Sequence, residues 1–165
     1  MLITFDHQWA QWTATTRTWN QFLHERCAHG ELDWIRIIQQ EPAYTRDHIP
    51  RLVKNALRTI QTRRCIWCHA PLPLNDTTLE HVIPLASPVW DTMFSLERLL
   101  SLRLAHTTCN LAYAQWRREY PHRAKRSDTA RLRRIRHVLR TDEDQIAWRA
   151  WLTTRYPETL MHPSL

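Results

Sequence analysis

Two pairs of cysteine and histidine residues have the spacing of a metal site. Cys65 and Cys68 enclose two residues, and His106 and Cys109 repeat that spacing about forty residues later. Together they offer the four ligands of a tetrahedral structural zinc, which would tie a knuckle to the start of a helix. The first ten residues lack the apolar run of a secretion signal, so we expect reduced thiols and zinc rather than disulfides. Cys27 lies in a helical pattern and is interpreted as a small buried apolar residue.

The segment LEHVIPL, residues 79–85, places Glu80 and His81 side by side in an otherwise aliphatic stretch. Its branched residues predict a short strand, and Pro84 limits how far that strand can continue in a sheet. Taken alone, such a pair is typical of a solvent-exposed edge, because one of two neighbours on a strand faces water. Whether the pair does chemistry instead depends on the motifs around it.

The motifs CIWC, LEHVIPL and LAHTTCN, spread over residues 65–120, together resemble the zinc-containing HNH endonucleases, whose catalytic module is a ββα-metal finger. By this resemblance His81 is the general base, Glu80 binds a catalytic Mg²⁺ or Mn²⁺, and Asn110, directly after Cys109, is the second ligand of that ion. Phosphodiester hydrolysis needs a nucleophile, neutralised phosphoryl oxygens and help for the leaving 3′ oxygen, and hard cations take oxygen ligands. The resemblance also implies 5′-phosphate and 3′-hydroxyl products.

The sequence departs from the family pattern at three places. Ser101 stands where the family has its middle Asn, which orients the imidazole. The loop that usually contains Gly-Gly has the sequence ASPVWDTMFSLER, and Tyr113 stands where a basic residue often follows the final Asn. A serine must orient His81 through a shorter arm or a bridging water. If it does not, a residue of the 86–100 loop must hold the ring instead.

Residues 117–140 carry ten basic side chains and two acidic ones, within a net charge of +7. A charge run is commonly a solvated helix face. Beside a finger that resembles a phosphodiesterase, we interpret it as a surface for the nucleic-acid backbone, because the guanidinium fork suits phosphate oxygens. The predicted contacts are Arg117, Arg118, Arg123, Lys125, Arg126, Arg131, Arg133 and Arg134. We expect double-stranded DNA as the partner, without base-specific readout.

Helices are expected to hold these residues in place. Gly30 is the only glycine, so tight hairpins that need positive φ are difficult to build and a mainly helical chain is expected. Apolar residues at three- and four-residue steps predict helices over 6–29, 31–40 and 47–64. The tryptophans of the first two helices are interpreted as core residues rather than platforms for base stacking.

The second part of the chain reads as the finger followed by more helices. In order, the sequence predicts a strand over 79–85, a loop of some fifteen residues, a strand over 99–106, a helix over 107–120, a helix capped by Ser127, a helix capped by Thr141, and a loose tail over 157–165. The predicted class is therefore α+β and mainly α-helical. A zinc-stapled ββα finger (65–120) lies between a helical region (1–64) and a basic helical region (121–165).

The leading hypothesis is a metal-dependent HNH endonuclease that nicks or cuts DNA, of a kind that serves in antiviral defence, in mobile elements and in phage genomes. Its helical flanks are expected to dock a protein partner. No run approaches the roughly 20 apolar residues of a membrane span, so we expect a cytoplasmic protein without a membrane partner. Two alternatives stay open: a zinc-dependent nucleic-acid-binding or scaffolding module with weakened catalysis, and a nuclease licensed by a partner such as an ATPase.

Overall fold

The computed structural model describes residues 3–6, 8–39, 51–141 and 154. Its elements, in chain order, are α1 (Trp9–Ala28), α2 (Leu32–Gln39), α3 (Arg51–Ile60), β1 (Thr78–His81), the 3₁₀-helix η2 (Trp90–Thr92), α4 (Ser95–Leu100), β2 (Leu102–Ala105), α5 (Thr107–Glu119) and α6 (Pro121–Thr141). The predicted α+β class is confirmed, because helices dominate the described residues around one two-stranded antiparallel hairpin.

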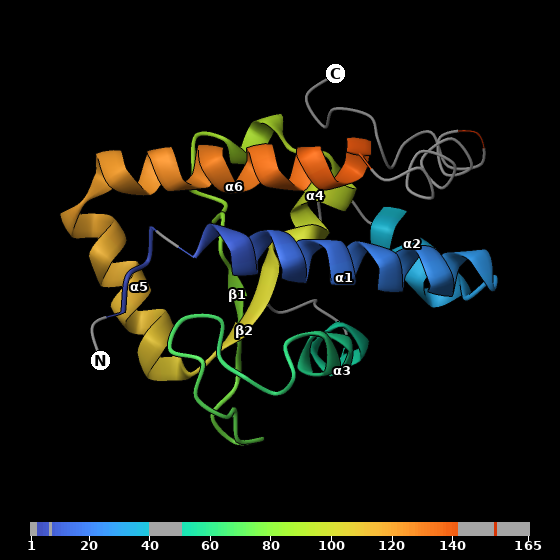
Figure 1. Cartoon of the computed structure of the whole chain (residues 1–165), viewed down its shortest axis with the longest axis horizontal. Helices are drawn as coiled ribbons and strands as arrows, with labels where there is room; N and C mark the ends of the chain where they lie inside the picture. Colours follow the sequence, from blue (N-terminus) through green and yellow to red (C-terminus); the bar gives the residue numbers. More distant parts are fainter. Residues whose placement is uncertain (1–2, 7, 40–50, 142–153, 155–165) are drawn as a thin grey trace.

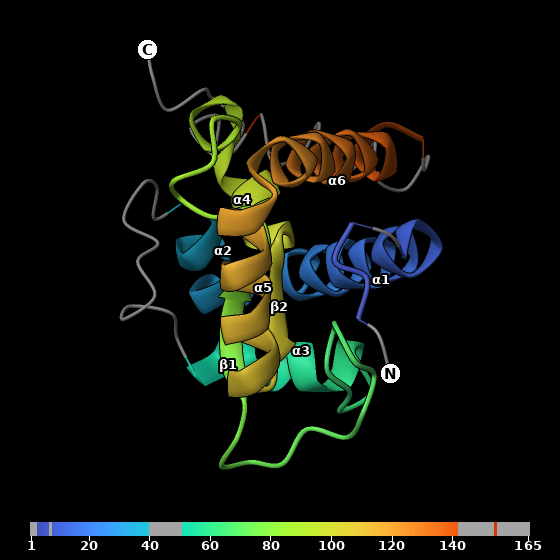
Figure 2. The same cartoon turned by 90° about the vertical axis from the view of Figure 1, so that its left-hand side faces the viewer.

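The hairpin lies between two helices. Strand β1 pairs antiparallel with β2, so that Thr78 stands opposite Ala105 and His81 opposite Leu102. Helix α5 lies against β1 and α3 lies against β2, and Figure 2 shows the two helices on opposite sides of the strands. The ββα arrangement expected for residues 65–120 is therefore present, and α3 covers its far side.

The outer edge of β2 is closed by a side chain rather than by a third strand. Gln61 follows α3 and is buried; its amide nitrogen donates to the Leu104 carbonyl at 3.0 Å and its amide oxygen accepts from the Leu104 N–H at 2.7 Å. The Ile66 N–H also donates to the Leu104 carbonyl, at 3.0 Å. Because open strand edges invite unwanted pairing, these bonds both protect the hairpin and fix α3 and the CxxC segment to it.

Helices α1 and α6 lie side by side across the hairpin (Figure 1) and share one hydrophobic core with the other elements. Trp19 of α1 is fully buried, and its indole N–H donates to the Leu99 carbonyl at 3.0 Å. Trp34 of α2 packs edge-on against Trp19, with ring centroids 5.7 Å apart. The interpretation as core residues is confirmed for Trp12, Trp19 and Trp34, as is the burial of Cys27, whereas Trp9 is only partly buried.

The predicted end of the first helix is also confirmed. Helix α1 ends at Ala28, and Gly30 has a φ of 75°, in the region that glycine adopts most easily. Its N–H donates to the Cys27 carbonyl at 3.0 Å, which closes the last turn. A side chain at position 30 would meet no atom within 4 Å, so the positive φ accounts for the glycine there.

The second predicted strand begins later than the sequence suggested. Residues 95–100 form α4, so the segment 99–106 is helical in its first two residues and extended only over Leu102–Ala105. The carboxylate of Glu97 accepts the Phe94 N–H at 3.0 Å and thereby caps the first turn of α4. A short apolar run does not by itself distinguish a buried helix from a strand, which explains the misassignment.

The start predicted for the next helix, at Ser127, is wrong because α6 begins at Pro121, where proline is preorganised for a first turn. Helix α6 continues to Thr141, so the helix predicted beyond that residue lies outside the described residues, as do residues 47–50 and the predicted tail. In the part of the chain that the structure describes, no helix combines the length and apolar character needed to cross a bilayer.

Candidate metal centre and adjoining pocket

Cys65, Cys68, His106 and Cys109 form one cluster in which all ligand atoms lie within 4.8 Å of one another. The Nδ1 atom of His106 is 3.3 Å from the Cys68 sulfur and 3.9 Å from the Cys109 sulfur. Around a tetrahedral zinc with ordinary bond lengths, neighbouring sulfur and nitrogen ligands lie about 3.5–3.8 Å apart. The cluster predicted from the sequence therefore has the dimensions of a structural zinc site.

The two ligand pairs come from two different local structures. Cys65 and Cys68 lie in a tight turn in which the Cys65 N–H donates to the Ala70 carbonyl at 3.0 Å, and His69 takes a positive φ of 61°. His106 is the residue immediately before α5, and Cys109 lies in the first turn of that helix. The strand β2 leads directly into His106, so the hairpin brings the second pair to the first.

The imidazole of His106 is held in the tautomer that a metal ligand needs. Its Nε2 atom lies 2.9 Å from the Pro71 carbonyl oxygen, which can only accept a hydrogen bond. Nε2 therefore carries the proton and leaves the Nδ1 lone pair facing the cysteine sulfurs. A backbone carbonyl behind a ligating histidine is a common arrangement, because it orients the ring and makes the other nitrogen more basic.

The cysteine thiols of the cluster differ in how readily they ionise. Burial opposes ionisation of Cys68, but hydrogen bonds from the Ala70 amide, the other cysteines and His106 outweigh it and lower the pKa of that thiol. Burial and the charge of Cys65 raise the pKa of Cys109 to about 12. Several adjacent thiols cannot all ionise without a counter-charge, and a bound divalent cation supplies that charge.

A pocket of about 180 Å³ lies beside β1 and is lined by Leu79, Glu80, His81, Pro84, Leu85 and Asn110. Three of the four predicted catalytic residues, Glu80, His81 and Asn110, therefore line the same space. Glu80 and His81 are each only 8% exposed, so the alternative reading of the pair as a solvent-exposed strand edge is wrong. Burying an acid and a histidine together is costly unless the site gives them partners.

The side chain of Asn110 is oriented by a short chain of hydrogen bonds. Its Nδ2 atom lies 3.3 Å from the Thr78 hydroxyl, which lies 3.3 Å from the Ala105 carbonyl. The carbonyl only accepts, so the hydroxyl donates to it and accepts from the amide N–H of Asn110. This order turns the amide nitrogen toward β1 and leaves the amide oxygen available as a ligand.

The ring of His81 stacks on Trp90, with centroids 5.7 Å apart and planes inclined by 26°. Trp90 opens η2 and is itself buried; the Arg98 guanidinium lies 4.7 Å from the Trp90 ring centroid and donates to the Trp90 carbonyl at 3.1 Å. No sequence pattern singled out Trp90. The sequence pointed to it only through the expectation that, if Ser101 does not orient the imidazole, a residue of the 86–100 loop does.

Ser101 lies at the end of α4, next to the residue that pairs with His81, and is fully buried. Its hydroxyl donates to the Arg98 carbonyl at 2.7 Å. The hydroxyl thus bonds to the same arginine that packs on Trp90. Direct orientation of the imidazole by Ser101 stays a prediction.

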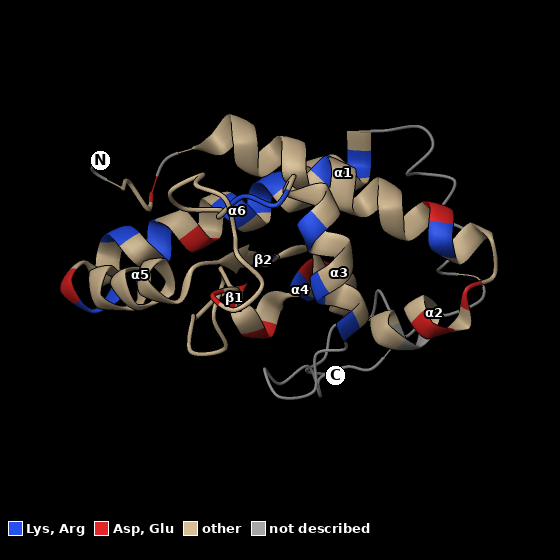
Figure 3. Ribbon diagram, turned by 90° about the horizontal axis from the view of Figure 1, so that it is seen from below, with Lys and Arg blue, Asp and Glu red and all other residues tan. Residues whose placement is uncertain are grey.

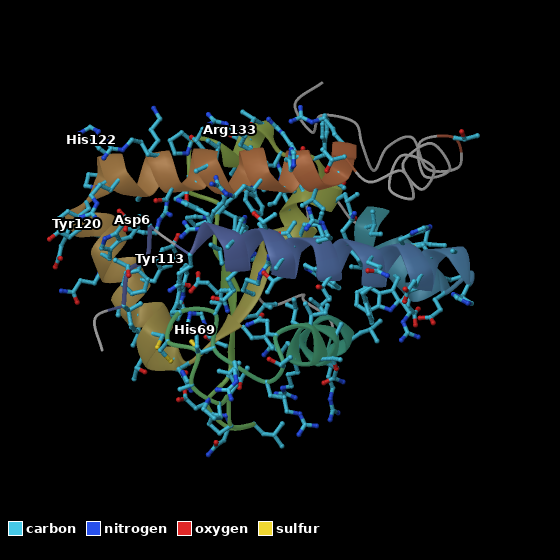
Figure 4. The ribbon with its side chains drawn as sticks, viewed as in Figure 1. Asp6, His69, Tyr113, Tyr120, His122 and Arg133 are labelled. Atoms are coloured by element: carbon cyan, nitrogen blue, oxygen red, sulfur yellow. The ribbon has the colours of Figure 1, made fainter. Side chains whose placement is uncertain are left out.

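Tyr113 connects the CxxC turn, α5 and the segment after β1. Its hydroxyl donates to the Val82 carbonyl at 2.6 Å, and its ring lies 4.4 Å from that of Trp67, between the two cysteines of the turn. Tyr113 is 1% exposed, and burial raises the pKa of its phenol. The family's basic residue is thus replaced here by the buried Tyr113, which Figure 4 labels on α5. The Arg117 guanidinium donates to its hydroxyl at 2.8 Å.

Two arginines predicted to contact nucleic acid are held by contacts within the protein. Arg131 is 2% exposed and donates to the Phe5 carbonyl, so little of its guanidinium is accessible to a phosphate, and the predicted contact stays a prediction. Arg117 directs two hydrogen bonds of 2.7 Å at the carboxylate of Asp128, which is fully buried. A buried carboxylate needs such a partner, and a guanidinium used in this way has little capacity left for a ligand.

The remaining predicted contacts lie nearer the surface. Arg123 is half exposed and pairs with Asp6 at 2.6 Å, and Arg134 lies 4.5 Å from the centroid of the Trp9 ring. The exposed members are Arg118, Lys125, Arg126 and Arg133. The only acidic residue of α6 is the buried Asp128, so the outer face of the helix, where Figure 4 shows His122 and Arg133, carries basic side chains without acidic ones.

Comparisons of the chain with protein-family models, with curated proteins and with solved structures found no match. The features that point to a function are therefore the geometry of the cluster and of the pocket.

Proposed function

We propose that this protein is a metal-dependent endonuclease of the HNH type that hydrolyses phosphodiester bonds in DNA. The observation that carries the proposal is the convergence of Glu80, His81 and Asn110 on one pocket, beside a Cys₃His cluster on a ββα unit. A buried acid, a buried histidine and an oriented amide are the groups that this chemistry uses.

The Cys₃His cluster would hold zinc in a structural role. Its four protein ligands leave no position for water or substrate, so the ion would join α5 to the CxxC turn and take no part in hydrolysis. Asn110 directly follows Cys109 in α5, so the cluster also bears on where the Asn110 amide lies.

His81 acts as the general base. Its imidazole takes a proton from the water that attacks phosphorus, while Trp90 keeps the ring plane from rotating. The Glu80 carboxylate and the Asn110 amide oxygen would hold a divalent cation, Mg²⁺ or Mn²⁺, which neutralises charge on the phosphoryl oxygens when bound. The hydrogen bond from Tyr113 to Val82 fixes the backbone next to His81, which limits drift of the base.

Nicking of supercoiled plasmid tests the proposal. Wild-type protein with Mg²⁺ or Mn²⁺ should nick the plasmid, and EDTA should stop it. His81→Ala and Asn110→Ala should each lose activity, because they remove the base and a cation ligand. His122→Ala is the matched control, since His122 is exposed on α6 and should leave nicking unchanged. Equal nicking by His81→Ala and wild type would sink the proposal.

A second candidate function is a zinc-dependent nucleic-acid-binding or scaffolding module. The Ser101 hydroxyl donates to the Arg98 carbonyl, whereas the family's Asn at this position orients the imidazole of the base. This difference favours weakened catalysis. Under this alternative the plasmid assay shows DNA binding with either ion but no His81-dependent cleavage.

A further inference from the structure

A second and larger pocket lies on α3, away from the residues that line the candidate catalytic pocket. Its volume is about 490 Å³, within the range of small-molecule sites. One wall consists of polar residues of α3 and the turn after it, and the other is the proline-containing strap that leads from the CxxC turn toward β1. The lining residues are Asn55, Arg58, Thr59, Arg63, Leu72, Pro73 and Leu74.

The guanidinium groups of the two arginines that line this pocket have no ion-pair or hydrogen-bond partner among the described residues. The Nε atom of Arg58 is buried without a hydrogen bond. In contrast, Arg117, Arg123 and Arg136 each pair with a carboxylate at 2.6–2.8 Å. A donor that is removed from water and left without an acceptor is destabilising, so an anion that supplies the acceptor has a free-energy advantage at Arg58.

The chain segment that lines the pocket is rich in positive charge. Between residues 51 and 75 the sequence has five basic residues and no acidic one, and Asp76 is the first acidic residue after them. In Figure 3 the ribbon of α3 carries blue segments and no red segment. The field at the pocket therefore attracts anions from solution.

The backbone holds the two walls at a fixed spacing. Thr62 and Arg63 take positive φ values of 50° and 56°, a conformation disfavoured for residues with side chains. The turn they form presents the Arg63 carbonyl to the Leu72 N–H at 2.8 Å, and Arg64 forms an isolated bridge with Pro71. The strap and the end of α3 are thus joined, and the pocket between them is preformed.

The two walls fit two parts of one ligand. Guanidinium groups bind phosphate oxygens through paired N–H donors. Leu72, Pro73 and the 79% exposed Leu74 offer an aliphatic surface that suits the C–H faces of a sugar. We propose that this pocket binds one sugar–phosphate unit of a nucleic-acid strand, with its phosphate at Arg58 and Arg63.

Chain length places this unit near the candidate catalytic pocket. Leu74 is six residues before Glu80, so even a fully extended chain separates their Cα atoms by no more than about 22 Å. This span corresponds to about six base steps of a duplex. The choice of a nucleic-acid strand over a free nucleotide rests on the proposed function, and the pocket would bind the backbone a few nucleotides from the cut.

Binding of a fluorescent 30-base-pair duplex to the His81→Ala protein, measured by anisotropy without added Mg²⁺, tests the inference apart from catalysis. Arg58→Gln with Arg63→Gln should weaken binding about tenfold and reduce the log–log salt slope by about 1.8, from two contacts of about 0.9 each. Arg51→Gln with Lys54→Gln is the matched control, because it removes two charges from the same helix outside the pocket. Equal losses in both double variants, or no loss in the first, would overturn the proposal.

Two further arms complete the test. Leu74→Ser, at an exposed position, should weaken binding two- to threefold with an unchanged salt slope, because it alters only the aliphatic wall. Competition with deoxyadenosine monophosphate and with inorganic phosphate separates a strand from a free anion: displacement of the duplex at micromolar concentrations would make the pocket a receptor for small anions and overturn the proposal.

The nuclease proposal and the pocket proposal can be refuted separately, because plasmid nicking tests the first and duplex binding by the pocket variants tests the second. A wild type that never nicks refutes the nuclease, while a loss of binding in Arg58→Gln with Arg63→Gln still supports the pocket. Thermal unfolding of each variant checks that the fold is intact.

Discussion

The Tyr113 hydroxyl donates to the Val82 carbonyl at 2.6 Å, and Val82 is the residue directly after His81. A helix side chain thereby holds the backbone at the point where β1 ends and the candidate base is presented. Arg117 donates to the same hydroxyl at 2.8 Å and also to the buried Asp128, so the contact belongs to a network that includes α6. The position of His81 thus depends on packing far from it in sequence.

Tyr113→Phe should lower both stability and nicking. The variant leaves the buried Val82 carbonyl without its donor, which costs about 1–3 kcal/mol. Urea unfolding measures the loss of stability. The rate of plasmid nicking at saturating DNA should fall, whereas the affinity for DNA should not change. Tyr120→Phe is the control, because Tyr120 is 44% exposed at the end of α5. Equal effects of the two variants would contradict the role given to Tyr113.

Trp90 should matter more to the orientation of His81 than Ser101 does. Trp90→Ala removes the stacked ring and should cost about 3–5 kcal/mol, with a large fall in nicking. Trp90→Phe retains an aromatic face and should recover most of the rate. Ser101→Ala loses only the bond to the Arg98 carbonyl and should reduce nicking mildly. If Ser101→Ala lost most of its nicking activity while Trp90→Ala stayed active, the order would be reversed and Ser101 would be the residue that orients His81.

Metal analysis should find one zinc per chain. Cys109→Ser should abolish zinc binding and destabilise the protein strongly, since structural zinc contributes on the order of 10 kcal/mol in small modules. Cys27→Ser is the matched control: Cys27 is also buried but lies in α1, outside the cluster, so its variant should keep the metal. Folded wild-type protein without zinc would refute the assignment.

Stability should fall in alkaline solution because of Cys27. Burial, with a smaller effect from Glu31, raises the pKa of its thiol from 9.0 to about 12. The unfolded chain therefore loses this proton at lower pH than the folded chain, so the stabilisation is full below pH 9 and declines up to about pH 12. The slope from this thiol is at most about 1.4 kcal/mol per pH unit. Denaturant unfolding across this range should show a shallower decline for Cys27→Ala, and identical declines would contradict the assignment.

Two neighbouring arginines of α6 should behave differently. Arg133 is exposed, so Arg133→Gln should weaken duplex binding and lower the salt slope by about 0.9 with little change in stability. Arg131 is buried beside Tyr113 and Phe5, so Arg131→Gln removes the donor to the Phe5 carbonyl and should destabilise the protein by about 1–3 kcal/mol. Anisotropy and urea unfolding of both variants separate the two roles. A stable Arg131→Gln protein with weakened binding would show that the sequence interpretation of Arg131 was right.

The sequence by itself determined the features that depend on short spacing. The candidate zinc ligands follow from two pairs with the same separation, and α1, α2 and α3 follow from three- and four-residue apolar steps. The helix α5 was expected from the segment that starts at the second pair and stops before Pro121. Glu80, His81 and Asn110 were expected as site residues only because their motifs resemble those of the HNH endonucleases; their own pattern is equally typical of a solvent-exposed strand edge. Local periodicity and ligand spacing are properties of neighbouring residues, so they can be read along the chain.

Only the tertiary structure decided which charged and aromatic residues face inward. Nothing in the run from Arg117 to Arg140 distinguishes Arg131 from Arg133, yet one is buried and the other exposed. The difference arises because α6 packs on α1, which places Arg131 against Phe5, 126 residues away. The stacking of Trp90 on His81 likewise depends on how a loop folds back onto β1. Burial is set by contacts between distant segments, and a one-dimensional pattern does not contain them.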